Sequence, residues 1–177
     1  MSLILAVNAG SSSLKISLYR SDVQLILLAS ISNISAPPAV FNFNGELIPG
    51  TSITDHSSAF ACFLERLDAN QRNEIRHICH RVVHGGDMAE RVVIDEKSYD
   101  HIAAFSDLAP LHNGASLAVI KACIEQLPSA SSIAYFDTTF HRSIPPHIAS
   151  YPIDQSVAAR KGLKKYGFHG LSCQFPP

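Results

Sequence analysis

The sequence has few charged residues and no marked excess of either sign. Asp, Glu, Lys and Arg together make up 16% of the 177 residues, and the net charge at neutral pH is −1. Proteins that bind nucleic acid or membrane surfaces usually carry a clear basic excess. No apolar run approaches the ~18 residues that a membrane-spanning helix needs. We therefore expect neither nucleic acid nor a membrane as a partner.

Paired cysteines and a secretion signal are also missing. The four cysteines are widely scattered and form no Cys-x-x-Cys motif, which predicts reduced thiols. The opening Met-Ser-Leu-Ile-Leu-Ala-Val has no basic flank, and its apolar run is too short for a signal peptide. We therefore expect a cytoplasmic protein. Its 46% apolar residues are enough for a sizeable core.

The first fifteen residues combine a short apolar segment with a polar turn. Residues 3–7 read as a buried strand, and Asn-Ala-Gly-Ser-Ser-Ser at 8–13 is a dense turn signal. Apolar and polar residues then alternate over 14–19, which predicts a second strand. The turn offers N–H groups, hydroxyls, an amide and the ammonium of Lys15, which suit phosphates and a hydrated magnesium ion. An ordinary Ser-rich hairpin is the alternative. A Walker loop is excluded, because its Gly-x-x-x-x-Gly-Lys-Ser is missing and a strand follows the turn.

The remaining elements alternate between strands and helices. Further strands are predicted at 23–30, 75–83 and 132–136, with a hairpin turning at Asn44-Gly45. Helices are predicted after a cap at Asp55 or Ser57 and at 97–107, 113–126 and 155–161, and 145–152 reads as linker-like. The first helix is expected to bury Phe60, Phe63, Leu64 and Leu67 on one face. The helix at 113–126 is expected to carry Leu117, Ile120, Ile124 and Leu127 on one side and to end before Pro128. Consecutive strands followed by strand–helix alternation predict an α/β fold on a mixed sheet.

Two charged residues stand next to or within apolar strands. Asp137 directly follows the strand at 132–136, where a carboxylate can hold a metal or orient a reacting group, or simply cap the next turn. Arg81 lies inside the apolar strand at 75–83 and needs an anionic partner there. That partner is either a structural carboxylate or the carboxylate of a substrate.

The histidines carry weaker signals. His80 and His84 have the spacing of a zinc helix, but Val82-Val83 favour a strand and no Glu follows His80, so a metal role is disfavoured. His169 stands beside Gly170, which lets a ligand approach closely. A structural role is the usual alternative for such a loop histidine.

Five motifs together resemble one family, the acetate kinases. They occur in the family's order: Val7-Asn-Ala-Gly-Ser-Ser-Ser-Leu-Lys15, His80-Arg-Val-Val-His-Gly-Gly86, Leu108-Ala-Pro-Leu-His-Asn113, Phe136-Asp-Thr-Thr-Phe-His141 and Lys165-Tyr-Gly-Phe-His-Gly170. The resemblance covers nearly the whole chain and is least informative over residues 31–70. The family is roughly twice as long, so this chain resembles its N-terminal lobe and the start of the second.

The resemblance implies a fold and an activity. The fold would be a ribonuclease H-like mixed sheet with flanking helices, as in the lobes of the sugar kinase, Hsp70 and actin superfamily. Residues 1–150 would form the N-terminal lobe and 151–177 the beginning of an incomplete second lobe. The reaction would be ATP plus acetate to ADP plus acetyl phosphate, reversible and dependent on Mg²⁺. A homodimer is the common family assembly.

The resemblance also assigns roles to particular residues. Asp137 and His169 would be catalytic, Arg81 would bind the substrate carboxylate, and His112 would line the same cleft. Asn8 would belong to the metal site. Lys15 would contact ATP, with Ser11 and Ser13 supporting the same phosphate-binding turn.

The end of the chain departs from the family pattern. After Gly170 it reads Leu-Ser-Cys-Gln-Phe-Pro-Pro, where the family continues with Thr-Ser-His and a long helix. The second lobe, with its adenosine pocket and further catalytic residues, is missing. We therefore expect poor activity or none from this chain alone. The alternatives are a kinase for propionate or butyrate, and a non-catalytic anion-binding or dimerisation lobe.

Overall fold

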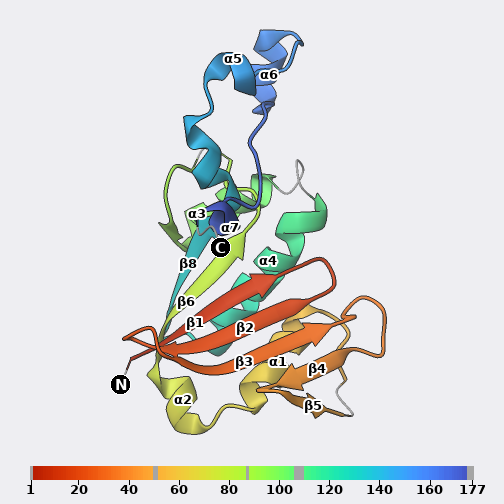
Figure 1. The fold of residues 1–177 in the computed structure, drawn as a ribbon, viewed down its shortest axis with the longest axis vertical. Coiled ribbons are helices and arrows are strands. Elements are labelled where there is room, and N and C mark those ends of the chain that lie inside the picture. Colours follow the sequence, from red (N-terminus) through yellow and green to blue (C-terminus); the bar gives the residue numbers. More distant parts are fainter. Residues whose placement is uncertain (1, 50–51, 87, 106–109, 175–177) are drawn as a thin grey trace.

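In the described part of the chain, one mixed β-sheet of eight strands organises the fold (Figure 1). The computed structural model describes residues 2–49, 52–86, 88–105 and 110–174, and the side chains of 110–112 are outside this description. The strand order across the sheet is β5-β4-β3-β2-β1-β6-β8-β7. The strands are β1 (Leu3–Ala9), β2 (Leu14–Arg20), β3 (Leu25–Ser32), β4 (Val40–Phe43), β5 (Glu46–Ile48), β6 (Ile75–Val82), β7 (Val92–Val93) and β8 (Ser131–Phe136).

The two halves of the sheet differ in strand direction. Strands β1 to β5 pair antiparallel with their neighbours, as consecutive hairpins do. Strands β1, β6 and β8 run parallel, with the short antiparallel β7 at the edge. The carboxyl ends of β1, β6 and β8 therefore lie at one end of the sheet, where ligands gather in α/β proteins. This mixed sheet with flanking helices confirms the predicted fold class.

The helices occupy the connections between strands. Helices α1 and α4 contact each other, with α1 against β2 and α4 against β1, β6 and β8. The α-helices are α1 (His56–Glu65), α2 (Ala69–Glu74), α3 (Glu96–Ala104), α4 (Pro110–Gln126), α5 (Pro146–Ala149), α6 (Gln155–Lys161) and α7 (Gly170–Cys173), and η2 (Asp137–Ser143) is a 3-10 helix. No helix in the described ranges is long and apolar enough to span a membrane.

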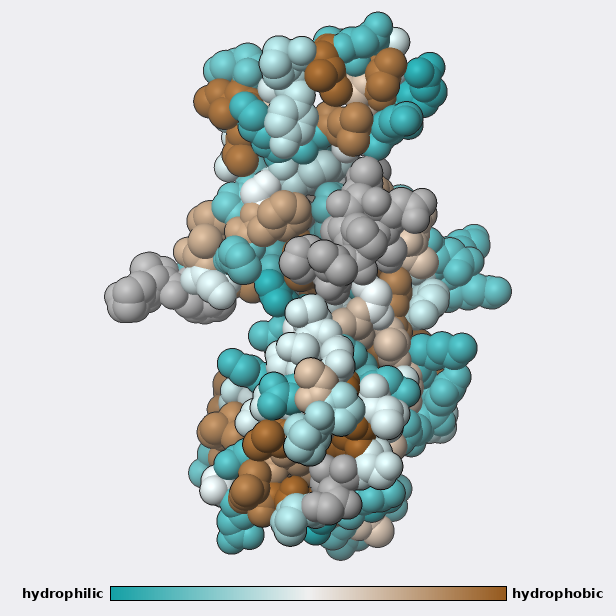
Figure 2. Space-filling model, turned by 90° about the vertical axis from the view of Figure 1, so that its right-hand side faces the viewer, coloured by the Kyte–Doolittle hydropathy of each residue, from teal (hydrophilic) through white to brown (hydrophobic). Residues whose placement is uncertain are grey.

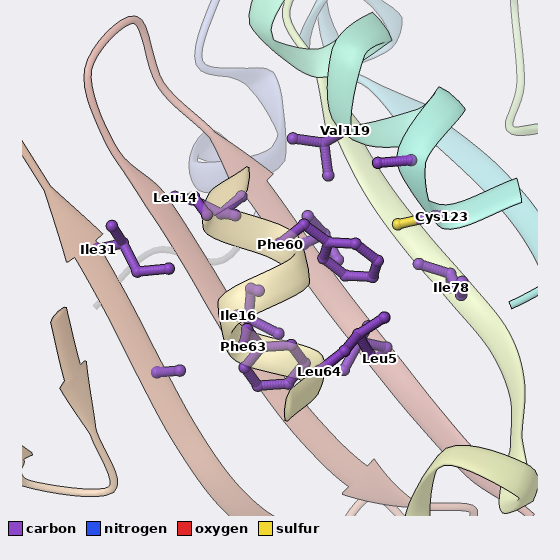
Figure 3. Packing of buried hydrophobic residues seen from close by; sticks show 14 of the residues in the cluster. Leu5, Leu14, Ile16, Ile31, Phe60, Phe63, Leu64, Ile78, Val119 and Cys123 are labelled. Atoms are coloured by element: carbon purple, nitrogen blue, oxygen red, sulfur yellow. The ribbon is translucent and has the colours of Figure 1, made fainter. Parts of the chain in front are cut away.

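The main core lies between one face of the sheet and helices α1 and α4 (Figure 3). Alternate residues of the strands, such as Leu5 and Ile16, point toward Phe60 and Phe63 of α1, and Val119 of α4 belongs to the same core. The predicted apolar face of α1 is confirmed for Phe60, Phe63 and Leu64, and Leu67 is buried as predicted but lies two residues beyond the end of the helix. Burying such a side chain contributes about 1.5–3 kcal/mol. This packing fixes the sheet on which the candidate site is built.

The third strand begins two residues later than predicted. Val23 lies in the turn before β3 with a φ of 66° and is 74% exposed. The turn is closed by the Val23 N–H, which donates to the Arg20 carbonyl. The β-branched side chain resembled a strand residue, but the hairpin needs its backbone to reverse direction.

Helix α4 buries a broader surface than one predicted face. Of the four residues predicted on one side, Leu117, Ile120 and Leu127 are buried, whereas Ile124 is 44% exposed. Ile120 packs in a second cluster with Val82 and Phe136, on a different side of the helix from Val119. Contacts on two sides spread the apolar residues around α4, so spacing alone could not tell which one faces solvent.

Two other segments, the predicted helix at 97–107 and the linker-like stretch at 145–152, differ from the prediction in the extent of their helices. Helix α3 ends at Ala104 with Phe105 as its C-cap, while residues 106–107 of the predicted helix lie outside the described ranges. The linker-like stretch 145–152 contains the short helix α5, which begins with Pro146 at a position where its missing N–H costs nothing.

Residues after η2 leave the sheet and project from it (Figure 1). Helices α5 and α6 lie at the far end of this projection, and the chain then returns to place α7 beside η2 and β8. Several apolar side chains are exposed here, among them Ile148, Tyr151 and Ile153, and Figure 2 shows apolar residues on the surface of the projecting end. The return of the chain brings residues 168–171 back to the carboxyl end of the parallel strands.

Candidate functional site

Arg81 lies at the centre of the candidate site, near the end of β6. Its neighbours Ile78, His80 and Val82 face the core, so Arg81 lies on the opposite face of the sheet and is 24% exposed. Its Nε and Nη2 atoms donate to Oδ2 of Asp137 at 3.0 and 2.6 Å, and Nη1 donates to Oδ1 of Asn8 at 3.3 Å. The guanidinium of β6 thus binds one side chain from the end of β1 and one that directly follows β8.

Asp137 is the partner that the buried strand position of Arg81 requires. Its side chain is only 2% exposed, and it begins η2 directly after β8. Oδ2 accepts both bonds from Arg81, and Oδ1 faces the Leu171 N–H at 3.5 Å. The carboxylate bonds therefore go to Arg81 and α7 rather than to a cap of the following turn. The sequence left two partners open for Arg81, a structural carboxylate or the carboxylate of a substrate. The structure shows a carboxylate of the chain itself, that of Asp137.

A hollow of about 470 Å³ opens on the side of Arg81 that faces β1 and β2. Asn8 and Lys15 line it from opposite strands, where they are paired in the antiparallel register. Leu171 and Tyr135 form its apolar wall, and Cys79 lies in the same hollow. The structure thus brings together an amide, an ammonium and a guanidinium in a cavity that an anionic ligand can enter.

The polar turn at residues 10–13 is held in place from two sides. The Gly10 N–H donates to the Ser13 carbonyl at 2.8 Å, and Nε2 of His56 lies 2.7 Å from the Gly10 carbonyl. Because a carbonyl only accepts, the His56 Nε2 must carry the proton in this bond. The Ser35 hydroxyl donates to the Ser11 carbonyl at 3.3 Å. The turn is therefore held by contacts on two sides, and one of them comes from His56, which no sequence motif indicated.

A second, smaller hollow of about 180 Å³ also has Arg81 in its lining. Gly10 and Ser11 line it from the turn, and Phe168 and His169 line it from the returning chain. Val83 completes the apolar part of this hollow. Ser11 and His169 thus share a cavity with Arg81, whereas Ser13 acts through its carbonyl in closing the turn.

His169 is placed by an unusual backbone conformation. Its φ is 57°, in the left-handed region, and it directly precedes α7. The next residue has no room for a side chain, because a Cβ on Gly170 would overlap the Asp137 carbonyl. The glycine therefore permits the close packing of α7 on η2 that keeps His169 next to the smaller hollow.

Two other histidines are buried beside the site and differ from His169. His80 points into the core, lies 3.2 Å from the Ser132 hydroxyl, and has its pKa lowered to about 3 by burial. His84 accepts a bond from the Gly86 N–H at Nδ1, and burial, aided by the charge of Lys164, lowers its pKa. Both rings are therefore neutral at physiological pH. The predicted strand at 75–83 is confirmed over Ile75–Val82, so His80 does not lie on a helix.

His112 remains a prediction. Its backbone lies in the first turn of α4, but its side chain is outside the described part of the structure. Its neighbour Asn113 is fully buried and binds the backbone of His84.

The oxygen atoms near Arg81 bear on whether the site suits a magnesium ion. In the described ranges no three His, Cys, Asp or Glu side chains come together as a metal site. Mg²⁺ does not need one, because it commonly binds one or two carboxylates, several waters and substrate phosphates. Among the described residues, Asp137 Oδ1 has only a long contact to the Leu171 N–H, so it retains the capacity to accept. Asp137 and Asn8 therefore fit a magnesium ion that is completed by water and phosphate.

Comparison with known protein families gives one match. The model of the acetokinase family matches residues 3–176. A probable acetate kinase of Emericella nidulans is 43% identical, and the match covers 97% of this chain and 44% of the relative. An acetate kinase of Bacillus mycoides is 40% identical, over 99% of this chain and 46% of the relative.

Solved structures give the same result. The acetate kinase of Porphyromonas gingivalis superimposes with a TM-score of 0.87 at 28% identity, and a propionate kinase of Francisella tularensis with 0.88 at 34%. Each match covers 99% of this chain but 47% of the solved chain. The chain thus spans a little under half the length of the relatives that it matches.

Proposed function

The chain belongs to the acetokinase family, and we propose that it supplies the N-terminal half of the active site of an acetate kinase. That enzyme would transfer the terminal phosphoryl group of ATP to acetate, giving ADP and acetyl phosphate, and would run in reverse. The observation that most supports this proposal is the convergence of Asn8, Arg81 and Asp137 at one end of the sheet, joined by hydrogen bonds.

Arg81 is proposed to hold the acetate. A guanidinium has five N–H donors, and the three bonds to Asp137 and Asn8 use three of them. Within the part of the chain that the structure describes, one N–H remains unused on each terminal nitrogen, which allows a substrate carboxylate to bind. Each such charge-assisted bond contributes about 1.5–3 kcal/mol. The methyl group of acetate would then face Val83 and Phe168 in the smaller hollow.

Asp137 is proposed to orient the reactants rather than to act as a base. Acetate is already ionised at neutral pH, so no proton has to be removed before it attacks. One acetate oxygen forms a bond to the γ-phosphorus, the bond from that phosphorus to the bridging oxygen breaks, and the electron pair leaves with ADP. The residues must therefore align the two oxygens and neutralise charge.

The phosphates are proposed to be bound by four residues: Lys15, Ser11, Ser13 and His169. Lys15 and Asn8 line the larger hollow at Arg81, and Ser11 and His169 line the smaller one, so both hollows offer donors to a phosphoryl group near Arg81. A bound Mg²⁺, held by Asp137 with Asn8 nearby, would offset charge on the phosphate oxygens. His112 is proposed to line the same cleft.

The rest of the active site is proposed to come from a second half that this chain does not contain. Residues 1–150 would form the first lobe and 151–177 the start of the second, with the projecting α5 and α6 belonging to that second lobe. The adenosine pocket and the homodimer contact would also depend on the longer protein. Catalytic groups that act together fail together, so the chain alone should turn over poorly.

A hydroxylamine-trapping assay tests the proposal. The 177-residue chain is incubated with ATP, Mg²⁺ and acetate, alone and with a separately produced second half from an acetate kinase of the family. We expect little acetyl phosphate from the chain alone and clear production from the mixture. Turnover restored by the second half but equal with Arg81→Ala would contradict the proposed role of Arg81. No turnover in the mixture, despite complex formation, would favour a non-catalytic anion-binding or dimerisation lobe.

Propionate is a second candidate substrate, because one structural relative is described as a propionate kinase. The same mixture assayed with acetate, propionate and butyrate gives the preference directly. A larger kcat/KM for propionate than for acetate would favour this second candidate.

A further inference from the structure

Three buried polar side chains bind the backbone between Arg81 and Gly85. Ser116 of α4 donates from its hydroxyl to the Arg81 carbonyl at 3.3 Å. Thr138, the residue after Asp137, accepts from the Gly85 N–H at 3.2 Å. Asn113 of α4 makes two bonds to His84, accepting from its N–H at 3.1 Å and donating to its carbonyl at 3.0 Å.

The double bond of Asn113 to His84 makes a specific chemical demand. One side chain must both accept and donate at a fixed separation, and a primary amide does this where a carboxylate or an alkyl group cannot. Asn113 is 0% exposed, so water cannot replace either bond. A buried polar group left without its partner costs about 1–3 kcal/mol. The amide therefore fixes the His84 backbone as a neighbouring strand would.

This fixed backbone connects the two charged partners of the site. Arg81 lies three residues before His84 on the same chain segment, and Thr138 binds the next residue, Gly85, from the position adjacent to Asp137. The loop is also tight, because a Cβ on Gly85 would overlap the Phe136 ring. A shift of His84 and Gly85 would therefore move Arg81 relative to Asp137.

We propose that Asn113 is a positioning residue, which acts through the backbone of His84 and Gly85 to hold Arg81 in its two-bond contact with Asp137. Ser116 and Thr138 support the same segment. This inference deepens the proposed function, because Arg81 and Asp137 are its central residues. Its test concerns their geometry and needs no turnover, so the two proposals can fail separately.

The experiment follows the Arg81 Nε–H by nuclear magnetic resonance in the ¹⁵N-labelled 177-residue chain. The reference is Asp137→Asn, which removes the ionic acceptor of that proton and marks the resonance of a displaced arginine. We expect Asn113→Ala to move the Arg81 resonance at least halfway toward the reference. The Nε–H proton of Arg81 should exchange with solvent at least about tenfold faster. This factor corresponds to about 1.4 kcal/mol less free energy protecting that proton from exchange.

Two controls separate positioning from loss of stability. Val119→Ala removes buried apolar contacts from the same helix, away from the loop, and should lower stability while leaving the Arg81 resonance in place. Thr138→Val keeps the side-chain shape but removes the acceptor for Gly85, so it serves as the milder variant if Asn113→Ala does not fold. An unchanged Arg81 resonance in the folded variants, or an equal change in Val119→Ala, would overturn the proposal.

Discussion

Arg81 binds Asp137 through two nitrogens that both donate to the same carboxylate oxygen, Oδ2. The other oxygen is left facing the Leu171 N–H of α7 at 3.5 Å. The pair is asymmetric in burial as well, because the Asp137 side chain is 2% exposed and that of Arg81 24%. This asymmetry determines how the two residues should respond to substitution.

We predict that Arg81→Ala destabilises the chain more than Asp137→Asn does. Without Arg81 the buried carboxylate has no cation, which should cost about 3 kcal/mol in the free energy of unfolding. In Asp137→Asn the carboxylate charge is lost, but Arg81 can still reach water. The free energy of unfolding should therefore fall by only about 1 kcal/mol. Urea unfolding of both single variants and the double variant measures the coupling. A double variant whose loss equals the sum of the single losses would show that the two residues do not stabilise each other.

A second prediction concerns substrate use in an enzyme completed with the missing half. Arg81→Ala should raise the KM for acetate at least tenfold, because losing one charge-assisted bond of about 1.5–3 kcal/mol already corresponds to this factor. The KM for ATP should change less than about twofold. Steady-state assays with each substrate varied in turn give both values. Lys15→Ala is the matched control and should affect ATP more than acetate. The same loss for both substrates in both variants would contradict the assigned roles.

A third prediction concerns the pH dependence of stability. Burial lowers the pKa of His80 to about 3, while an unfolded histidine has a pKa near 6.5. The unfolded chain therefore binds a proton at His80 below about pH 6.5 that the folded chain does not bind. The stabilisation is complete above that pH and is lost at about 1.4 kcal/mol per pH unit as the pH falls toward 3.

Urea unfolding between pH 7.5 and pH 5 tests this pH dependence. His80→Leu should remove a slope equivalent to about one proton, while any slope due to His84, whose pKa is also lowered, remains. A His80→Leu variant with the same slope as the unchanged chain would show that His80 is not buried in its neutral form.

A fourth prediction compares two helix caps of the same type. Asp55 caps α1 and Asp68 caps α2, each by accepting from the backbone N–H three residues later, while its own N–H donates to the side chain of that residue. Asp55→Ala should cost about 1 kcal/mol, because α1 carries buried core residues such as Phe60. Asp68→Ala should cost less than half of that, since α2 buries none of its residues. Equal losses in thermal or urea unfolding would show that the contribution of a cap is independent of the packing of its helix.

Much of the fold could be predicted because its signals are local. The strand at Ile75–Val82 and the helix at Gln155–Lys161 follow from β-branched content and from spacing, and both agree with the structure. The hairpin at Asn44-Gly45 follows from the backbone preference of those two residues, which both have positive φ. Val23 was predicted incorrectly as a strand residue because a turn overrides the local pattern, and the exposure of Ile124 could not be read from its spacing because α4 packs on two sides.

The candidate site likewise contains residues that the sequence could predict and residues that only the structure shows. The polar turn, Arg81 and Asp137 could be selected from the sequence because charges and glycines beside apolar strands are conspicuous. Nothing local indicated that His56 supports the turn or that Asn113 and Thr138 hold the loop after β6. Those contacts join residues that are 29 to 53 positions apart.

The sequence by itself determined which residues carry charge and polarity and which segments form strands and helices, because both depend on neighbours in the chain. Only the tertiary structure decided that Arg81 and Asp137 bind each other. Strands β6 and β8 pair in parallel with Val82 beside Phe136, so Asp137 emerges next to Arg81. That register depends on packing across the whole sheet, and packing of this kind has no local pattern in the sequence.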